Sequence, residues 1–224
     1  MASGDESGDV RMEGPIPEER FDDVIAHLRC SFFADEPLNR SVRLCERGQP
    51  HRELEEHARQ TLRDNLSEMA LDAATNQVVG VALNGVLWPG DLDQAQAKLS
   101  DMDDAKFRRI FGLLYSVNRR LDLFAAFNVD RIFECRILSV DHRYRGRGLA
   151  RTLLARSLQA AKDAGFQLVK EDATGLFSQR AAESMGFQTL HEMPYEEYKN
   201  EDGGIAFPTE DPHKTLKIMV KQLH

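Results

Sequence analysis

The sequence predicts an α/β (α+β) protein in which helices flank one mixed sheet. Segments with apolar residues at helical spacing alternate with short apolar segments typical of strands along the chain. The best strand candidate, residues 131–140, leads through a glycine-containing loop into a helix. A length of 224 residues fits one domain, and no repeat or linker divides the chain. We therefore expect a disordered acidic tail over residues 1–9 and a single domain over residues 10–224.

Helices and a hairpin are expected in the N-terminal half. After Pro17, an apolar stripe that begins at Phe21 predicts a helix. Pro37 ends this helix, because a proline pushes the preceding residue toward extended geometry. The further elements expected here are a polar helix over residues 53–65, a hairpin of strands over 68–73 and 78–88, and a helix over 103–124.

The C-terminal half continues the alternation of strands and helices. After the strand at 131–140 and the loop at 141–148, a helix over residues 149–164 is ended by Gly165. The elements that follow are a strand over 166–171, a short helix over 176–185, a strand over 187–193, a polar loop over 195–212 and a last strand over 215–221. This order of strands and helices indicates a mixed α/β arrangement around one sheet.

Composition excludes several classes of partner. The net charge of −8 argues against nucleic acid, whose binding depends on clustered Lys and Arg. No apolar run reaches membrane-spanning length, and the acidic N-terminus is unlike a secretory signal, so no membrane partner is expected. Three widely spaced cysteines suit a reducing compartment, and we expect a cytoplasmic protein. The seven histidines show no paired spacing, so no metal site is expected.

The loop after the best strand carries the clearest functional signal. Residues 142–150 read HRYRGRGLA, so the loop leaves a strand and enters a helix. Backbone amides at such a helix N-terminus bind phosphate or pyrophosphate, and glycines let a ligand approach closely. The segment lacks the GK[ST] of a P-loop, and Arg151 stands where the dinucleotide fingerprint requires its third glycine. A surface turn that happens to be rich in Arg and Gly is the alternative.

The RxxGxG pattern, placed between a strand and a helix, resembles the pyrophosphate loop of the GCN5-related N-acetyltransferase superfamily. The resemblance implies that fold, with a mostly antiparallel sheet splayed around an acetyl-coenzyme A cleft. It implies that acetyl-coenzyme A is the cosubstrate. The cofactor-binding residues implied are Leu138, Ser139, Val140, Arg143, Tyr144, Arg145, Gly146, Arg147, Gly148, Leu149, Ala150 and Ser178.

A motif in the N-terminal half resembles one group within this superfamily. Asp35-Glu36-Pro37-Leu38 resembles the DEPL segment of the insect-type arylalkylamine N-acetyltransferases, which include the dopamine N-acetyltransferases. The Thr174–Ser178 pair and the final segment around Pro212-His213 resemble the same family. The resemblance implies acetyl transfer to dopamine, serotonin, tyramine, octopamine, tryptamine or similar amines. It also implies Glu36 as the general base, although an ordinary carboxylate at a helix C-terminus is the plain alternative.

The chemistry of the acceptor explains why a base is needed. An alkylamine titrates near pH 10, so roughly one molecule in a thousand is the free-base nucleophile at neutral pH. Removing that proton costs about 4 kcal/mol at pH 7. An exposed glutamate is a poor base, but the apolar neighbours Phe32, Phe33 and Leu38 would desolvate Glu36 and raise its pKa. We therefore expect a partly buried Glu36 that acts through ordered water.

Thr174 and Ser178 are expected to relay protons, with Ser178 protonating the departing thiolate. Their spacing of four would align both hydroxyls on one helical face, although helix capping by Thr174 is an equal alternative. Thr174 also departs from the family pattern, in which the first hydroxyl residue of this pair is often serine. Aromatic candidates for the amine slot, with packing in the core as the alternative, are Phe32, Phe33, Phe111, Tyr115 and Phe177.

Three interpretations of the function stay open at this point. The first is direct attack by the amine on acetyl-coenzyme A in a ternary complex, without an acetylated Cys135, in a monomer. The second is acetylation of polyamines or protein N-termini. The third is a coenzyme-A-binding module without catalysis, which intact Glu36 and Ser178 argue against.

Overall fold

The computed structural model describes residues 9–223, and within them the strands form a seven-stranded sheet. The strand order is β1-β2-β3-β4-β5-β7-β6, and every neighbouring pair is antiparallel except β4–β5. This confirms the expected mostly antiparallel mixed sheet. The strands are β1 (Val10–Glu13), β2 (Glu68–Asp72), β3 (Val78–Leu87), β4 (Ile132–Val140), β5 (Leu168–Ala173), β6 (Gln188–Pro194) and β7 (Thr215–Gln222).

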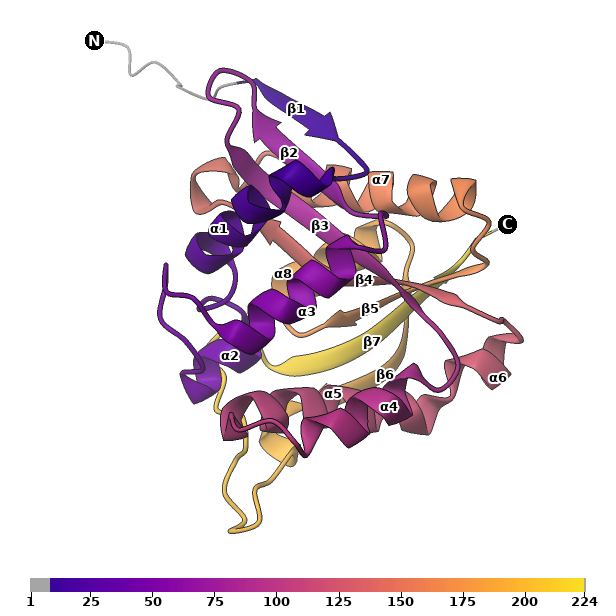
Figure 1. Ribbon diagram of the computed structural model, residues 1–224. Coiled ribbons are helices and arrows are strands. Elements are labelled where there is room, and N and C mark those ends of the chain that lie inside the picture. The colour runs from indigo at the N-terminus through magenta and orange to yellow at the C-terminus, as the bar shows by residue number, and fades with distance from the viewer. Residues whose placement is uncertain (1–8, 224) are drawn as a thin grey trace.

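Helices cover both faces of the sheet (Figure 1). On one face, α1 and α3 pack against β3, while α5 packs against α4 and α2 beside the lower strands. On the other face, α7 packs across β2, β3 and β4, and α8 packs on β5 and β7. The helices are α1 (Phe21–Ser31), α2 (Pro37–Val42), α3 (Arg52–Leu62), α4 (Asp91–Leu99), α5 (Ala105–Leu121), α6 (Leu123–Phe127), α7 (Leu149–Asp163) and α8 (Leu176–Ser184), with short 3₁₀ turns at Glu18–Arg20, His142–Tyr144 and Tyr195–Glu197.

Strands β4 and β5 separate soon after they meet. Their parallel pairing covers only Phe133 to Cys135 on β4 and Val169 to Glu171 on β5. Beyond these pairs β4 runs on to Val140 with its other edge bonded to β3, while β5 continues beside β7. The sheet is therefore splayed at the carboxyl ends of its two central parallel strands, as the family resemblance implies, and this end of an open sheet commonly holds ligands.

Four local expectations are corrected by the structure. Helix α1 ends at Ser31, and Pro37 opens the short helix α2 instead of ending α1, because a proline without an N–H fits the first helical position. The expected helix over 103–124 is broken at Asp122, whose φ of 39° is left-handed and starts α6. Helix α4 and strand β1 were not predicted as elements. The expected tail over residues 1–9 lies, apart from Asp9, outside the described residues.

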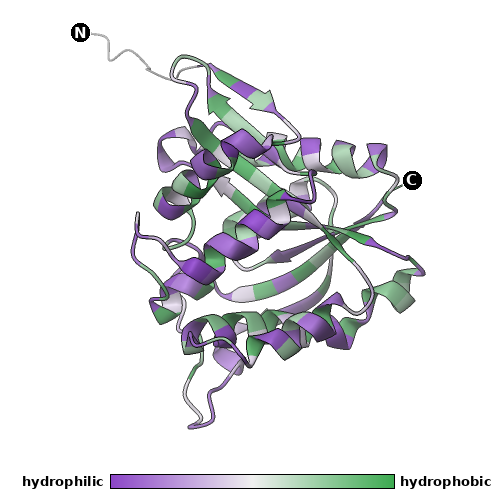
Figure 2. Cartoon of the chain, viewed as in Figure 1, coloured by the Kyte–Doolittle hydropathy of each residue, from purple (hydrophilic) through white to green (hydrophobic). Residues whose placement is uncertain are grey.

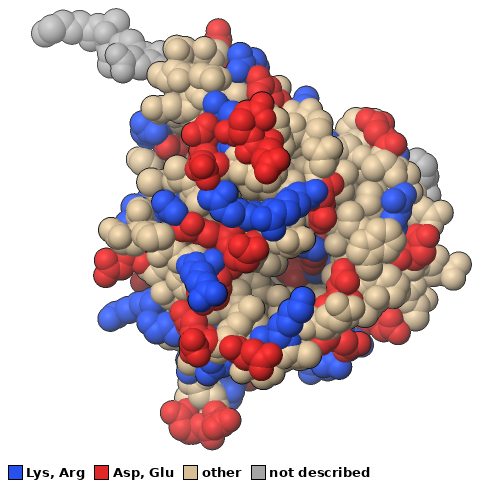
Figure 3. Space-filling view, in the orientation of Figure 1, with Lys and Arg blue, Asp and Glu red and all other residues tan. Residues whose placement is uncertain are grey.

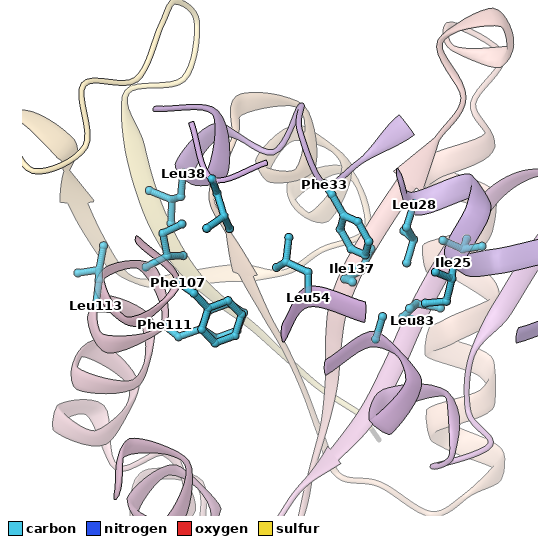
Figure 4. Close-up of a cluster of buried hydrophobic side chains, with 14 of the residues drawn as sticks. Ile25, Leu28, Phe33, Leu38, Leu54, Leu83, Phe107, Phe111, Leu113 and Ile137 are labelled. Carbon is cyan, nitrogen blue, oxygen red and sulfur yellow. The ribbon is translucent and has the colours of Figure 1, made fainter. Parts of the chain in front are cut away.

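The core lies between the sheet and each helical layer. Figure 2 shows apolar residues along the central strands and polar residues on the outer surface of α3. Figure 4 shows apolar side chains from α1, α3, α5 and β4 pointing toward one another, among them Leu28, Leu54, Phe111 and Ile137. A second cluster, which includes Phe133 and Leu154, fills the space under α7 and α8. Apolar burial on both faces therefore holds the splayed sheet in place.

Charged side chains are interspersed on the face that carries α1 and α3. In Figure 3 acidic and basic groups alternate across this face, and acidic groups gather at the tip of the loop before β7. Ion pairs such as Arg29–Glu55 and Arg59–Asp22 link neighbouring helices here. Among the described residues, none of the helices combines the length and apolar character that crossing a membrane requires.

Glu171 carries a carboxyl group that is buried on the apolar, α7-covered face of the sheet. Glu171 is 4% exposed, it lies opposite Cys135 in the β4–β5 register, and its Oε2 has no hydrogen-bond partner among the described residues. Burial, with a smaller contribution from the charge of Asp172, raises the pKa of Glu171 from 4.5 to about 8. The group is therefore protonated in the folded protein at neutral pH.

Glu171→Gln is expected to stabilise the fold at high pH. Unfolded glutamate ionises at pH values where folded Glu171 keeps its proton, so the wild-type free energy of unfolding falls as pH rises from about 4.5 to about 8. Glutamine lacks this loss, and its advantage should grow to the order of a few kcal/mol by pH 8. Denaturant unfolding of both proteins at pH 5 and pH 8 measures it. A stability difference that is the same at both pH values would contradict the assignment.

Candidate active site

Glu36 stands at the N-terminus of a helix and not at the C-terminus that the sequence indicates. It is the N-cap of α2, and its Oε2 accepts a hydrogen bond of 2.7 Å from the backbone N–H of Asn39. The Asn39 side chain is buried and donates to the Phe33 carbonyl at 2.9 Å, which ties α2 to the turn after α1. The Asn39 N–H therefore orients the Glu36 carboxyl, and the Asn39 side chain holds the start of α2 against the preceding turn.

The Glu36 carboxyl is enclosed although the residue as a whole is half-buried. Its Oε1 is inaccessible and has no partner among the described residues. Burial raises the pKa of Glu36, while the nearby Thr174 hydroxyl and the N–H groups of Asn39 and Leu38 partly offset this rise. The net shift is upward, as the expected desolvation requires, and it makes Glu36 a stronger base than an exposed glutamate.

A cavity of about 260 Å³ adjoins this carboxyl. Its wall comes from the turn after α1, from α2, α3, α4 and α5, and from β4 and β5 where they separate. Four of the five aromatic candidates line it: Phe32, Phe33, Phe111 and Tyr115. The fifth, Phe177, is 64% exposed and packs edge-on against His213. The volume suits a small molecule, and the wall is mainly apolar with a few polar groups.

Thr174 and Ser178 do not share a helical face. Gly175 is the N-cap of α8, so Thr174 precedes the helix, where its side chain lines the cavity beside Glu36. Thr174 therefore does not cap α8 with its side chain. Ser178, on the first turn of α8, donates its hydroxyl to the Gly175 carbonyl at 2.9 Å and is not part of the cavity wall. The structure thus brings Thr174, but not Ser178, to the Glu36 carboxyl.

The glycine loop has the shape of an anion cradle. Gly146 and Gly148 both have φ of 78°, and Gly148 is the N-cap of α7. Within residues 9–223, the backbone N–H groups of residues 146–150 find no acceptor. A Cβ added at either glycine would meet nothing within 4 Å. These amides point into open space at the positive end of a helix, which fits a pyrophosphate group.

The loop side chains are largely engaged with the protein. Arg143 forms a two-pronged contact with Asp141, at 3.1 Å from Nε and 2.8 Å from Nη2. Arg145 donates to the Val140 carbonyl, and the Arg147 guanidinium lies over the Tyr144 ring. Arg143 is therefore neutralised by a neighbouring carboxylate, and less free positive charge faces outward than three arginines indicate.

Residues 138–140 end the strand that separates from β5. Their backbone pairs with β3 on one side, while the opposite edge has no strand partner within the described chain. The buried Ser139 hydroxyl lies 3.0 Å from Nε2 of His27 on α1. Burial lowers the pKa of His27 to about 4, although the charge of Asp141 opposes the shift, so the imidazole is neutral at pH 7. The contact of His27 with Ser139 therefore adds no positive charge beside this part of β4 at pH 7.

A network of buried charges, absent from the sequence-based expectations, crosses the sheet where the strands part. Lys170 is fully buried and pairs with Glu134, its partner in the β4–β5 register, and with Asp172 at 2.8 Å. Arg136 pairs with the other Glu134 oxygen at 2.8 Å. Burial disfavours the Lys170 ammonium, but the two carboxylates raise its pKa overall. The signal that could have revealed the network is the spacing of charges two apart within otherwise apolar strands.

Among the described residues, one group of possible metal ligands lies close together: His51, Glu53 and Asp104. His51 Nδ1 accepts a bond from the Leu54 N–H at the start of α3, and Asp104 Oδ1 accepts from the first amides of α5. Helix capping therefore accounts for His51 and Asp104 without an ion.

Residues 36–187 match the acetyltransferase (GNAT) family, a stretch that begins at Glu36 and covers most of the chain. The protein belongs to this family and is an acetyltransferase. Members of the family bind acetyl-coenzyme A, and the splayed sheet and glycine loop described above fit that class.

Two solved structures show which acetyltransferases this chain resembles. The chain is similar to arylalkylamine N-acetyltransferase 2 from Aedes aegypti, with a TM-score of 0.93, 48% identity, and coverage of 96% of this chain and 100% of that one. It is also similar to a putative arylalkylamine N-acetyltransferase 7 from the yellow fever mosquito, with a TM-score of 0.84, 28% identity, and coverage of 95% and 87%. The insect-type arylalkylamine N-acetyltransferase resemblance is therefore confirmed.

A third structure shares the fold alone. The polyamine N-acetyltransferase of Drosophila melanogaster has a TM-score of 0.84 but 21% identity, with coverage of 96% of this chain and 100% of that one. Such a likeness shows that acceptors of different chemistry are served by one architecture. The acceptor of the present chain must therefore be argued from its own cavity.

Proposed function

We propose that this enzyme transfers the acetyl group of acetyl-coenzyme A to the primary amine of arylalkylamines such as dopamine, serotonin, tyramine, octopamine and tryptamine. The observation that carries the proposal is the enclosure of the Glu36 carboxyl in a cavity with four aromatic side chains at the split between β4 and β5. An aromatic wall suits a flat ring, and a carboxyl at its edge suits the amine. The 48% identity to an arylalkylamine N-acetyltransferase supports the same acceptor.

Glu36 is the proposed general base of a direct attack. As the amine nitrogen bonds to the thioester carbon, Glu36 takes the proton that the nitrogen loses, directly or through water. The carbon–sulfur bond then breaks, and Ser178 supplies a proton to the departing sulfur after its hydroxyl leaves the Gly175 carbonyl. Ser178 recovers a proton from water, and Glu36 releases to water the proton that it took from the amine. Thr174 stabilises the ionised Glu36 carboxylate. Cys135 is buried and its thiol pKa is raised well above the usual value, which argues against an acetylated cysteine intermediate.

Acetyl-coenzyme A is proposed to lie along the free edge of β4 with its pyrophosphate in the glycine loop. The unbonded amides of residues 146–150, including Gly146, Gly148, Leu149 and Ala150, would hold the phosphates, and residues 138–140 would bind the pantetheine through their backbone. This path leads from the N-terminus of α7 toward the cavity at the split of the sheet. A monomer in the cytoplasm, without metal, nucleic acid or membrane partners, stays a prediction of the sequence.

A panel of acceptors tests the proposed function. Release of the coenzyme A thiol is followed with tyramine, dopamine, serotonin, spermidine and a peptide with a free N-terminus. The apolar cavity wall predicts that kcat/KM for the ring-bearing amines exceeds that for spermidine by about 10-fold or more. A preference for spermidine or the peptide would contradict the proposed acceptor. Calorimetric binding of acetyl-coenzyme A without turnover of any acceptor would indicate a binding module instead.

Glu36→Gln is expected to lower kcat/KM about 100-fold or more, because the base is lost while glutamine keeps an oxygen that can cap α2. In the wild type, activity should fall as pH drops through the pKa of Glu36, because protonation removes the base. Since that pKa is raised, the fall should begin at higher pH than for an exposed glutamate. Steady-state kinetics with tyramine between pH 6 and 9 measures both effects.

Asp35→Asn is the matched control for this substitution. Asp35 neighbours Glu36 in sequence but pairs with Arg47 at the surface and does not line the cavity. Its variant should keep near-wild-type kcat/KM. Near-wild-type activity of Glu36→Gln across the same pH range would refute the role of the base.

Gly146→Val is expected to raise KM for acetyl-coenzyme A about 10-fold, because the side chain would enter the space above the free amides and a charged hydrogen bond contributes about 1.5–3 kcal/mol. Gly203→Val is the control. Gly203 also has positive φ and open space where a Cβ would lie, so its substitution imposes a comparable backbone strain in a distant loop. Equal KM values for both variants and the wild type would place the phosphates elsewhere.

A further inference from the structure

Asn118 occupies the junction of two cavities. It lies on α5, is 3% exposed, and lines the cavity that contains Glu36. Together with Leu87 and Leu92 it also lines a second cavity of about 780 Å³, whose wall includes Arg119 and Phe124. Asn118 is therefore a polar residue at a boundary that is otherwise shared by leucines.

The orientation of the Asn118 amide is set by its partners. Its Nδ2 donates to the Leu114 carbonyl at 2.9 Å and to Oδ2 of Asp172 at 2.7 Å. Both partners accept hydrogen bonds, so reversing the amide would place oxygen against oxygen. Its Oδ1 consequently faces elsewhere, and it is buried without a partner among the described residues. Leaving such an acceptor unsatisfied destabilises the folded protein, and a ligand donor would remove that cost.

The charges around Asn118 favour a neutral donor. Asp172 is paired with Lys170, Lys170 with Glu134, and Glu134 with Arg136. Asp64 lies 4.0 Å from Arg136 and completes the group. Positive and negative charges alternate along these contacts, and each group has a partner of opposite sign. A hydroxyl can donate to Oδ1 without disturbing this arrangement.

Asn118 and Glu36 line the same cavity from different elements. Glu36 lies at the start of α2 beside Thr174, and Asn118 lies on α5, where Asp172 of β5 holds its amide. A ligand whose amine is held at Glu36 therefore lies in a cavity whose wall includes Asn118.

We propose that Oδ1 of Asn118 accepts a hydrogen bond from the ring hydroxyl of the arylalkylamine and thereby selects hydroxylated rings over bare ones. This inference rests on the proposed function, since it requires the amine to be held at Glu36. Asn118 acts on specificity, and Glu36 acts on the reaction. The aromatic wall supplies affinity for any flat ring, and the amide supplies the discrimination.

The test compares tyramine with phenethylamine, which lacks the hydroxyl, in the wild type and in Asn118→Ala. The wild-type kcat/KM should be about 10-fold higher for tyramine, and this ratio should fall close to one in Asn118→Ala. Losing the contacts to Leu114 and Asp172 affects both substrates alike, so only the hydroxyl contact moves the ratio. An unchanged ratio in Asn118→Ala would overturn the inference.

Asn84→Ala is the matched control, since Asn84 is fully buried, has an equally unpartnered Oδ1 and donates its Nδ2 to the Leu66 carbonyl outside the cavity. Its variant should keep the wild-type ratio of kcat/KM between tyramine and phenethylamine.

If Asn118→Ala does not fold, 4-methoxyphenethylamine tests the wild type, because its ether oxygen cannot donate a hydrogen bond. That compound should react as poorly as phenethylamine; a rate equal to that of tyramine would overturn the inference. Turnover of phenethylamine and tyramine at equal rates by the wild type also overturns it while leaving the proposed function intact, whereas no turnover of either amine refutes the proposed function itself.

Discussion

The ion pair between Glu134 and Lys170 joins β4 and β5 just before these strands separate, and the candidate active site depends on that separation. The two residues are register partners in the short parallel contact of β4 and β5, directly before the strands separate. An ion pair buried this deeply strongly resists the loss of one partner, because the other charge would be left unsolvated. The strands are thus tied by charge at the place where backbone pairing stops. The cavity, the free edge of β4 and the position of Thr174 all follow from that separation.

Much of the fold is predictable because it depends on local patterns. The strand over 131–140, the helix after the glycine loop and the last strand are all found within a residue or two of their expected ends. The wrong predictions fall where the local sequence is compatible with two structures. Pro37 fits either the end of one helix or the first turn of the next, and only the packing of α2 decides between them. Helix α4 was missed because its sequence is polar and its packing partner is α5.

The site is only partly predictable, for a different reason. The glycine loop is local, so its left-handed glycines and free amides follow from sequence and chain direction. Glu36 was predicted from its resemblance to a family motif, and Thr174, which adjoins it in the cavity wall, is distant in sequence. The expected alignment of Thr174 with Ser178 failed because α8 starts after Gly175. No sequence pattern indicated a role for Asn118, because Asp172, which orients its amide, lies 54 residues later in the sequence.

The way Asp141 holds Arg143 has a consequence for how this loop can change in evolution. The carboxylate bonds both the Arg143 backbone N–H and its guanidinium, and Tyr144 is anchored separately by Asp72 at 2.5 Å. The shape of the turn is therefore maintained by acceptors that lie outside the glycine pattern itself. Lineages could exchange the neighbouring Arg147, which contacts only the loop, and retain the same main-chain geometry, whereas drift at Asp141 or Asp72 would loosen it.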